Sequence, residues 1–333
     1  MHLKVASSKG EEARKKILSE GAYDPRREIQ RQGAFLFIPL TKKVVFPGAE
    51  IVKLAGIQVK KKPSSLKEAL TGSQSAEELE KLPKAYDLIG DIAIVEIPEV
   101  LAGKRKEIGE ALLSTFKNIK VVANKKTSVG TEYRIRDVEV IAGEKRTETV
   151  HREAGCVYKI DVTTAYFSPR LGTERMRVAS QVKEGERVLV MFAGIGPYAI
   201  LISKSARPKE VYAVELNPSA VEYMNENIKL NKVAVKAILG DAGVEAGKHG
   251  LFDRIIMPLP KDAGNFLDKA LPALNKGGLI NYYTFKGTTE EAAQEVKDIC
   301  SKLGYKIEII DSVECGTYSP QLSRMCVDFR VNL

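Results

Sequence analysis

Residues 187–199 constrain the fold more than any other stretch of the chain. An apolar run over residues 188–192 breaks into Gly194 and Gly196, and a helical pattern follows. This order predicts a strand, a tight turn and the start of a helix. Glycine tolerates positive φ and lets a ligand approach the backbone, while a helix N-terminus presents free N–H groups. The stretch therefore predicts a binding turn for a nucleoside-containing cofactor.

The residues that follow continue the alternation of strands and helices. A second expected strand ends at Glu215, where a carboxylate commonly binds the hydroxyl pair of a ribose. A third ends in Gly240-Asp241, and a fourth runs into Pro258-Leu-Pro260. The last two expected strands, residues 305–312 and 326–331, have no helix between them, so the final strand should be antiparallel. The pattern predicts a doubly wound α/β fold with a mostly parallel, seven-stranded sheet.

The glycine turn alone leaves the cofactor open. Gly194-x-Gly196-x-x-Ala199 formally matches a dinucleotide fingerprint, which would suit an NAD-dependent oxidoreductase. The terminal hairpin, Asp241 at the usual place of an adenine amino group, and the prolines beside a methyl acceptor favour S-adenosylmethionine instead. We therefore expect a class I (Rossmann-like) methyltransferase domain.

The chain is too long for one ordinary domain. Lysines followed by Pro-Ser-Ser over residues 60–65 interrupt the apolar pattern, which predicts a linker after a small αβ module. Strands and helices alternate less regularly in the middle of the chain, which indicates an α+β domain. We expect domains at residues 1–65, 66–167 and 168–333.

The net charge of +9 is concentrated at the start of the chain. Residues 1–65 hold 14 Lys and Arg against 6 Asp and Glu, a net charge of +8. A small basic module on near-neutral domains is typical of an electrostatic anchor for a polyanion. A solvated basic face is the alternative.

The cysteine and hydropathy patterns bear on metal sites, membrane spans and cellular location. The four cysteines form no Cys-x-x-Cys pair and only three histidines occur, so we expect no metal site. Whether Cys315 and Cys326 pair is left open. No apolar run approaches ~20 residues and the start lacks a signal-peptide pattern, so we expect no membrane span and a cytoplasmic location.

Several motifs go beyond this generic pattern. The strings Val188-Leu-Val-Met-Phe-Ala-Gly-Ile-Gly-Pro197 and Tyr166-Phe-Ser-Pro-Arg-Leu-Gly-Thr-Glu-Arg175 are the longest. Shorter ones are His151-Arg-Glu-Ala-Gly-Cys156, Val214-Glu-Leu-Asn-Pro218, Gly240-Asp-Ala242 and Met257-Pro-Leu-Pro260. Together they resemble the archaeal and eukaryotic tRNA (guanine-37-N1)-methyltransferases, and most closely the archaeal branch that takes part in wyosine synthesis. The resemblance covers most of the chain from about residue 85.

Two positions depart from the family pattern. Val190 stands where many members carry Asp, and Pro258 stands where Asn is common. Proline offers only its carbonyl, so a side-chain amide contact to cofactor or base is missing. The departure argues against methylation of an exocyclic amine and suggests a pocket of different shape.

The resemblance implies a role for a carboxylate and a guanidinium. N1 of guanine carries a proton at neutral pH, so it needs a general base and a cation where charge develops on O6. By resemblance, Glu174 is the base and Arg134 is the cation. The alternative for Glu174 is a helix-surface side chain paired with Arg170 or Arg177.

The remaining assignments follow from the same reasoning. For the substrate nucleotide we expect stacking or pairing by Tyr166 and Arg170, an aromatic contact from Tyr318 on a loop of the closing hairpin, and contacts from Arg136 and Pro260. To S-adenosylmethionine we assign Arg175, Phe192, Gly194, Gly196, Glu215, Leu216, Asp241, Ala242 and Pro258.

The resemblance also implies a partner and a second activity. The expected partner is tRNA, contacted at the anticodon loop by the catalytic half and at the elbow by the basic module, by a monomeric enzyme. The second activity is methylation of C7 of 4-demethylwyosine at position 37. A methyltransferase for another RNA or for protein stays open as an alternative.

Overall fold

The computed structural model describes residues 1–57, 63–126 and 137–332, and the chain divides into two units, Met1–Ser64 and Ser65–Leu333. Each unit is described by itself. Within the described residues, no helix is both long and apolar enough to cross a membrane.

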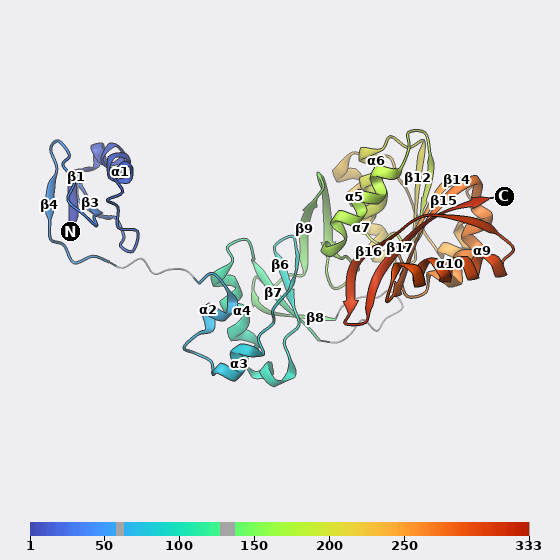
Figure 1. Ribbon diagram of the computed structural model, residues 1–333, viewed down its shortest axis with the longest axis horizontal. Coiled ribbons are helices and arrows are strands. Elements are labelled where there is room, and N and C mark those ends of the chain that lie inside the picture. The colour runs from blue at the N-terminus through green and yellow to red at the C-terminus, as the bar shows by residue number, and fades with distance from the viewer. Residues whose placement is uncertain (58–62, 127–136, 333) are drawn as a thin grey trace. The chain divides into compact units, whose positions relative to one another are not determined.

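In its described residues, the first unit is an antiparallel sheet with one α-helix (Figure 1). Its strand order is β2-β3-β1-β4. Leu3 and Val5 of β1 pack against Ala13 and Ile17 of α1, and these side chains are buried. The elements are β1 (His2–Ala6), α1 (Gly10–Ser19), β2 (Gln30–Gln32), β3 (Phe35–Pro39) and β4 (Glu50–Val52).

The second unit begins with a four-stranded sheet in the order β5-β6-β7-β8. Strands β6 and β7 are parallel, and the chain crosses between them through α4, which packs its apolar face on the sheet. The other pairs are antiparallel. The elements are α2 (Leu66–Leu70), α3 (Ala76–Glu80), β5 (Asp87–Ile89), β6 (Ile92–Val95), α4 (Arg105–Thr115), β7 (Val121–Lys125) and β8 (Val138–Gly143).

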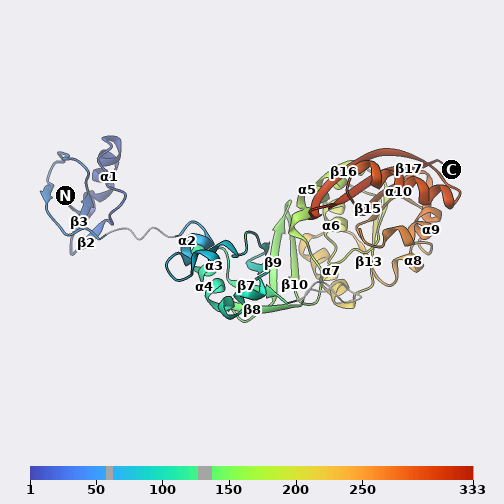
Figure 2. The same ribbon diagram turned by 60° about the horizontal axis from the view of Figure 1, so that its bottom comes forward.

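An antiparallel hairpin, β9 (Glu148–Glu153) and β10 (Cys156–Asp161), follows this sheet. Helix α7 lies beside β10 (Figure 2), and two of its asparagines hold the open edge of the hairpin. Asn227 and Asn231 each accept a backbone N–H of β10 and donate to a carbonyl of the same residue, Lys159 and Val157 respectively. Because its edge groups are paired in this way, the hairpin belongs to the packing of the larger sheet that follows.

That larger sheet has seven strands in the order β13-β12-β11-β14-β15-β17-β16. The first five are parallel to one another, and β17 is antiparallel to both of its neighbours. The predicted class I methyltransferase fold and its antiparallel final strand are confirmed. The strands are β11 (Arg187–Val190), β12 (Glu210–Glu215), β13 (Lys236–Leu239), β14 (Phe252–Met257), β15 (Leu274–Lys286), β16 (Lys306–Ser319) and β17 (Leu322–Asn332).

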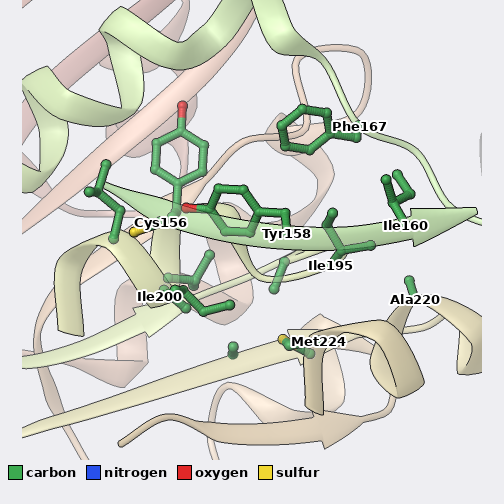
Figure 3. Packing of buried hydrophobic residues seen from close by; sticks show 14 of the residues in the cluster. Cys156, Tyr158, Ile160, Phe167, Ile195, Ile200, Ala220 and Met224 are labelled. Atoms are coloured by element: carbon green, nitrogen blue, oxygen red, sulfur yellow. The ribbon is translucent and has the colours of Figure 1, made fainter. Parts of the chain in front are cut away.

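Helices cover both faces of this sheet (Figure 1). One core lies between the sheet and α5, α6 and α7, and it also contains Tyr158 of β10 and Phe167 (Figure 3). A second core lies between the other face and α8, α9 and α10. The helices are α5 (Gly172–Gln181), α6 (Pro197–Ser205), α7 (Pro218–Asn231), α8 (Ala242–Glu245), α9 (Leu267–Ala270) and α10 (Thr289–Lys302).

The closing hairpin is longer than the sequence predicts. Strands β16 and β17 extend to Ser319 and Leu322, so Tyr318 lies at the end of a strand and not on a loop. Bulges in β16 let this long pairing follow the sheet. Cys315 and Cys326 are both free thiols.

Candidate active site

The turn after β11 has a backbone that needs glycine at two positions. Gly194 and Gly196 have φ values of +56° and +86°, a region that residues with a Cβ seldom adopt. A Cβ on Gly196 would also lie 2.9 Å from Met224 Cγ of α7. Phe192 has a φ of +55° and packs edge-on against Phe266, with ring centroids 4.8 Å apart. The turn therefore has a defined shape directly before α6.

Glu215, at the carboxyl end of β12, is hydrogen-bonded to this turn. Its Oε2 accepts the Gly194 N–H at 2.7 Å and its Oε1 accepts the Asn217 N–H at 2.9 Å. A carboxylate has about four lone-pair positions, so each oxygen keeps room for one more donor. The side chain is half-buried. The two oxygens fit the two hydroxyls of a ribose.

Leu216, Asp241 and Ala242 lie beside Glu215, because the Gly240 N–H donates to the Glu215 carbonyl at 3.0 Å. Asp241 Oδ1 caps α8 by accepting the Val244 N–H at 3.0 Å. Its Oδ2 has no hydrogen bond within the part of the chain that the structure describes. Leu216 is 40% exposed and Ala242 is buried. An apolar surface beside a free carboxylate oxygen fits an adenine ring and its amino group.

The predicted acceptor motif forms a tight turn after β14. The Leu259 N–H donates to the Met257 carbonyl at 2.8 Å, which places Pro258 at the centre of the turn. Pro258 is half-buried and Pro260 is buried. Pro260 lines a cavity of about 470 Å³ at the carboxyl ends of β14 and β15. The other lining residues are Lys261, Asp262, Gly264, Asn265, Tyr282, Thr284, Phe285, Lys286, Glu295 and Ile299.

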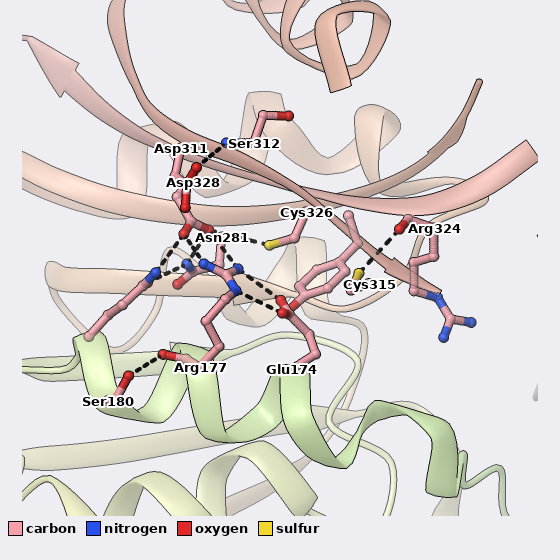
Figure 4. A network of polar contacts seen from close by, with 12 residues as sticks. Glu174, Arg177, Ser180, Asn281, Asp311, Ser312, Cys315, Arg324, Cys326 and Asp328 are labelled. Atoms are coloured by element: carbon pink, nitrogen blue, oxygen red, sulfur yellow. Dashed lines mark hydrogen bonds and ion pairs between the residues drawn. The ribbon is translucent and has the colours of Figure 1, made fainter. Parts of the chain in front are cut away.

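Glu174, the predicted general base, faces inward from α5 (Figure 4). Its side chain is only 5% exposed. The Arg177 guanidinium donates to both of its oxygens, at 2.7 and 2.8 Å, and the Tyr283 hydroxyl donates to its Oε1 at 2.6 Å. The alternative of a helix-surface glutamate is wrong, although the pairing with Arg177 that it included is confirmed. One lone pair of Oε2 is left for a further donor.

The contacts of Glu174 continue into a polar network beneath α5 (Figure 4). Arg177 also pairs with Asp328, which accepts amide donors from Gln181 and Asn281 at 2.7 and 2.6 Å. Burial by itself would raise the pKa of Asp328, but these hydrogen bonds more than offset burial and hold the pKa below its ordinary value. An ionised Asp328 thus holds Arg177, and Arg177 holds Glu174.

Arg175, which is assigned to the cofactor from the sequence, forms an ion pair with a glutamate of the β9–β10 hairpin. Its guanidinium makes two hydrogen bonds with Glu153 of β9, at 2.7 and 2.6 Å, and one with the Ser168 carbonyl at 3.0 Å. The ring of Phe167 lies 4.9 Å from its central carbon. These contacts join α5 to the β9–β10 hairpin. A contact of Arg175 with the cofactor stays a prediction.

The predicted nucleotide contacts lie in three places. The Tyr166 carbonyl oxygen would lie 3.5 Å from a Cβ on Gly194, so this residue borders the cofactor turn. Arg170 is largely exposed and pairs with Asp87 of β5 at 2.7 Å. Tyr318 is 65% exposed and stacks on Phe285, with ring centroids 4.2 Å apart. Arg134 and Arg136 lie outside the described residues.

Two residues at the site were missed by the sequence reasoning. Tyr283 and Tyr198 are both buried, and the Tyr198 hydroxyl donates to the Tyr283 hydroxyl at 2.9 Å. Tyr283 is 109 positions from Glu174, so only the parallel crossovers of the sheet bring them together. No spacing rule within one element would have found this pair.

Three family models match this chain. They are the TRM5/TYW2 methyltransferase domain over residues 149–308, the TYW2 N-terminal domain over residues 66–147 and the tRNA methyltransferase 5 N-terminal domain over residues 3–46. The predicted domain boundary between residues 167 and 168 lies inside the first of these matches and stays a prediction.

Two curated relatives illustrate a match over nearly the whole length of the relative. The tRNA (guanine(37)-N(1))-methyltransferase Trm5b of Pyrococcus abyssi is 42% identical over 99% of this chain and 98% of its own. The tRNA 4-demethylwyosine(37)-methyltransferase Taw21 of Saccharolobus solfataricus is 38% identical over 75% of this chain and 94% of its own.

Solved structures show the same fold. The complex of aTrm5 with tRNALeu is 34% identical, with a TM-score of 0.81 over all of both chains. The Methanocaldococcus jannaschii TYW2 in complex with AdoMet is 31% identical, with a TM-score of 0.57 over 74% of this chain and 99% of that one.

Proposed function

This chain belongs to the TRM5/TYW2 methyltransferase family, and from that premise we propose that it transfers a methyl group from S-adenosylmethionine to N1 of guanosine 37 in tRNA. The antiparallel β17, inserted between β15 and β16, departs from the dinucleotide-binding sheet, in which the sixth strand lies directly beside the fifth. The NAD-dependent alternative is therefore disfavoured.

The observation that carries this proposal is the place of Glu174. Two successive hydrogen bonds, through the hydroxyls of Tyr283 and Tyr198, connect its carboxylate to α6. Because α6 begins at Pro197, directly after Gly196 of the cofactor turn, this buried carboxylate lies on the face of the sheet that α6 covers. A base near the donor is what removal of the N1 proton requires.

Each residue at the site has a part in this reaction. The cofactor, when bound, supplies an electrophilic methyl group on its sulfonium sulfur. Glu215 would hold the ribose and Asp241 the adenine, and these contacts would fix the donor relative to the acceptor. Glu174 would accept the N1 proton at Oε2, which leaves N1 with the electron pair that can attack the methyl group. Arg134 would stabilise the negative charge on guanine O6.

The substrate is tested with three tRNA transcripts that differ only at position 37. We expect methyl incorporation from labelled S-adenosylmethionine when guanosine is present and none when adenosine replaces it, because adenine N1 carries no proton to remove and adenine lacks O6. Equal labelling of the guanosine and adenosine transcripts would contradict the proposal and favour another RNA target. The third transcript carries 4-demethylwyosine.

That third transcript tests a second candidate function, methylation of C7. Pro258 in place of the family asparagine favours it, and so does the similarity to Taw21. A carbon nucleophile needs no prior loss of an N–H proton, so the same donor site could serve both bases. Absence of label in the 4-demethylwyosine transcript would remove this second activity.

We also propose that the first unit contacts the tRNA elbow and the second unit the anticodon loop. Lys42 and Lys43 are exposed on the first unit, and neither makes an ion pair within the described residues. Replacing both with Gln is expected to weaken tRNA binding and to reduce the slope of log affinity against log salt by about 2, since each phosphate contact releases counterions. Filter binding over a salt series measures this slope.

A matched pair of neutralised lysines serves as the control. Lys276 and Lys302 are exposed on the second unit, and their replacement with Gln removes the same amount of charge. An equal loss of slope in both double variants would mean that net charge alone matters. The anchoring role of the first unit would then be rejected.

A further inference from the structure

We propose that Tyr283 is a positioning residue for the methyl transfer. Together with Arg177, it orients the Glu174 carboxylate so that a single lone pair of Oε2 is left to receive the proton of the acceptor. This inference rests on the proposed function, because it concerns the base of that reaction.

The hydroxyl of Tyr283 donates its proton in one direction, toward Glu174. Its side chain is 1% exposed, and its oxygen accepts the Tyr198 hydroxyl proton at 2.9 Å while it donates to Glu174 Oε1 at 2.6 Å. An ionised carboxylate can only accept, so the direction of this chain of hydrogen bonds is fixed. Each bond polarises the next, which strengthens the donor at Glu174.

Arg177 restrains the rotation of the Glu174 carboxylate. Its Nε and one terminal nitrogen hold the two oxygens of Glu174 in a planar, two-point contact, a geometry that restrains rotation. Asp328 holds the same guanidinium from the far side. Three of about four lone pairs of Glu174 are thereby occupied, and the free one lies on Oε2.

Tyr283 is not itself the base. Burial, together with the neighbouring Cys326, Tyr198 and Glu174, raises its pKa well above the ordinary value of a tyrosine. The hydroxyl therefore keeps its proton over the whole range in which the enzyme is assayed. Its contribution acts through Glu174.

The charged and titratable groups facing Glu174 come from every element packed around it. Arg177 lies on its own helix, Tyr198 on α6 and Tyr283 on β15. Cys326 and Asp328 lie on β17, and Cys315 lies on β16. Burial raises the pKa of Cys315 to about 12 and that of Cys326 well above its ordinary value, so neither thiol titrates near neutral pH.

The test compares two adjacent tyrosines on β15. Tyr283→Phe removes the donor to Glu174. Tyr282→Phe removes a hydroxyl that donates to Glu295 at 2.7 Å and belongs to the opposite core. Both variants lose one hydrogen bond from the same strand to a glutamate, buried for Tyr283 and part-buried for Tyr282. The full-length enzyme is assayed with guanosine-37 tRNA, and kcat is measured against pH at saturating tRNA and S-adenosylmethionine.

For Tyr283→Phe we expect kcat on the plateau to fall about tenfold, because the base loses its orientation. The acid limb of the profile should move to higher pH, because the ionised carboxylate loses a hydrogen bond that favours it. The KM for tRNA and the affinity for S-adenosylhomocysteine should not change. Tyr282→Phe should leave the acid limb where it is in the wild-type enzyme.

Tyr198→Phe extends the test if Tyr283→Phe is too unstable to assay. It leaves the bond from Tyr283 to Glu174 in place but removes the donor behind it, so we expect a smaller upward shift of the acid limb. The inference is overturned if Tyr283→Phe lowers kcat without moving the acid limb. It is also overturned if Tyr282→Phe moves the acid limb by the same amount. Failure of the wild-type enzyme to methylate guanosine 37 would instead overturn the proposed function.

Discussion

Replacement of Glu174 with Gln is expected to lower kcat for N1 methylation by about 10²- to 10⁴-fold, the usual contribution of a general base. Glutamine has nearly the same shape and its oxygen still accepts a hydrogen bond, but it cannot take a proton near neutral pH. Single-turnover methylation of guanosine-37 tRNA measures the effect. The affinity for tRNA should change far less than the rate.

A second, half-buried carboxylate provides the control for this substitution. Glu186 pairs with the buried Arg254 at 3.0 Å at the start of β11, near the other end of the polar network. Glu186→Gln weakens a similar ion pair at a distance from the cofactor turn. If it slows methylation as much as Glu174→Gln, the effect comes from the network and not from a base.

Glu174→Gln also separates the two candidate substrates. Methylation of C7 in 4-demethylwyosine has no N–H proton to remove before attack. We therefore expect this activity, where present, to lose much less rate than N1 methylation in the same variant. Thermal unfolding should confirm that the variant folds, since Arg177 keeps Asp328 as a partner.

Replacement of Glu215 with Gln is expected to raise the Kd for S-adenosylmethionine by about 10- to 100-fold. The single oxygen of glutamine can accept fewer hydrogen bonds than the two oxygens of the carboxylate. The NH₂ group would face the N–H of Gly194 or Asn217, two donors that the carboxylate now binds. A ribose hydroxyl that loses its carboxylate acceptor in the bound state costs about 1–3 kcal/mol, which corresponds to that range of affinity. Isothermal titration with S-adenosylhomocysteine gives the change directly.

Glu210 at the other end of β12 is the matched control. It pairs with Arg187 at 2.8 Å and with Lys236 at 2.6 Å, and these partners lower its pKa to about 2. Glu210→Gln removes the same charge from the same strand. Equal losses of cofactor affinity in both variants would show that Glu215 has no direct part in binding.

The local features of the site were predictable because short-range rules fix them. Two glycines between an apolar run and a helix require a turn with positive φ, and Gly194 and Gly196 have it. Glu215 lies one strand later at the same edge, because parallel strands end together. These positions depend on the chain within about one strand–helix–strand unit.

The environment of Glu174 was not predictable in the same way. Its burial depends on α5 packing over β15 and β17, and its donor Tyr283 comes from a strand that follows several crossovers. Arg175 illustrates the same limit, because its partner Glu153 lies on a hairpin whose placement depends on Asn227 and Asn231. Helical spacing cannot tell which of two neighbouring charges faces which partner.

The identity of the methylated atom tests the central claim most directly. Guanosine-37 tRNA methylated by the full-length enzyme is digested to nucleosides and analysed by mass spectrometry against 1-methylguanosine and N2-methylguanosine standards. We expect 1-methylguanosine alone, lost when position 37 is changed and greatly reduced with Glu174→Gln. A methyl group on N2, or on a nucleotide other than 37, would contradict the account.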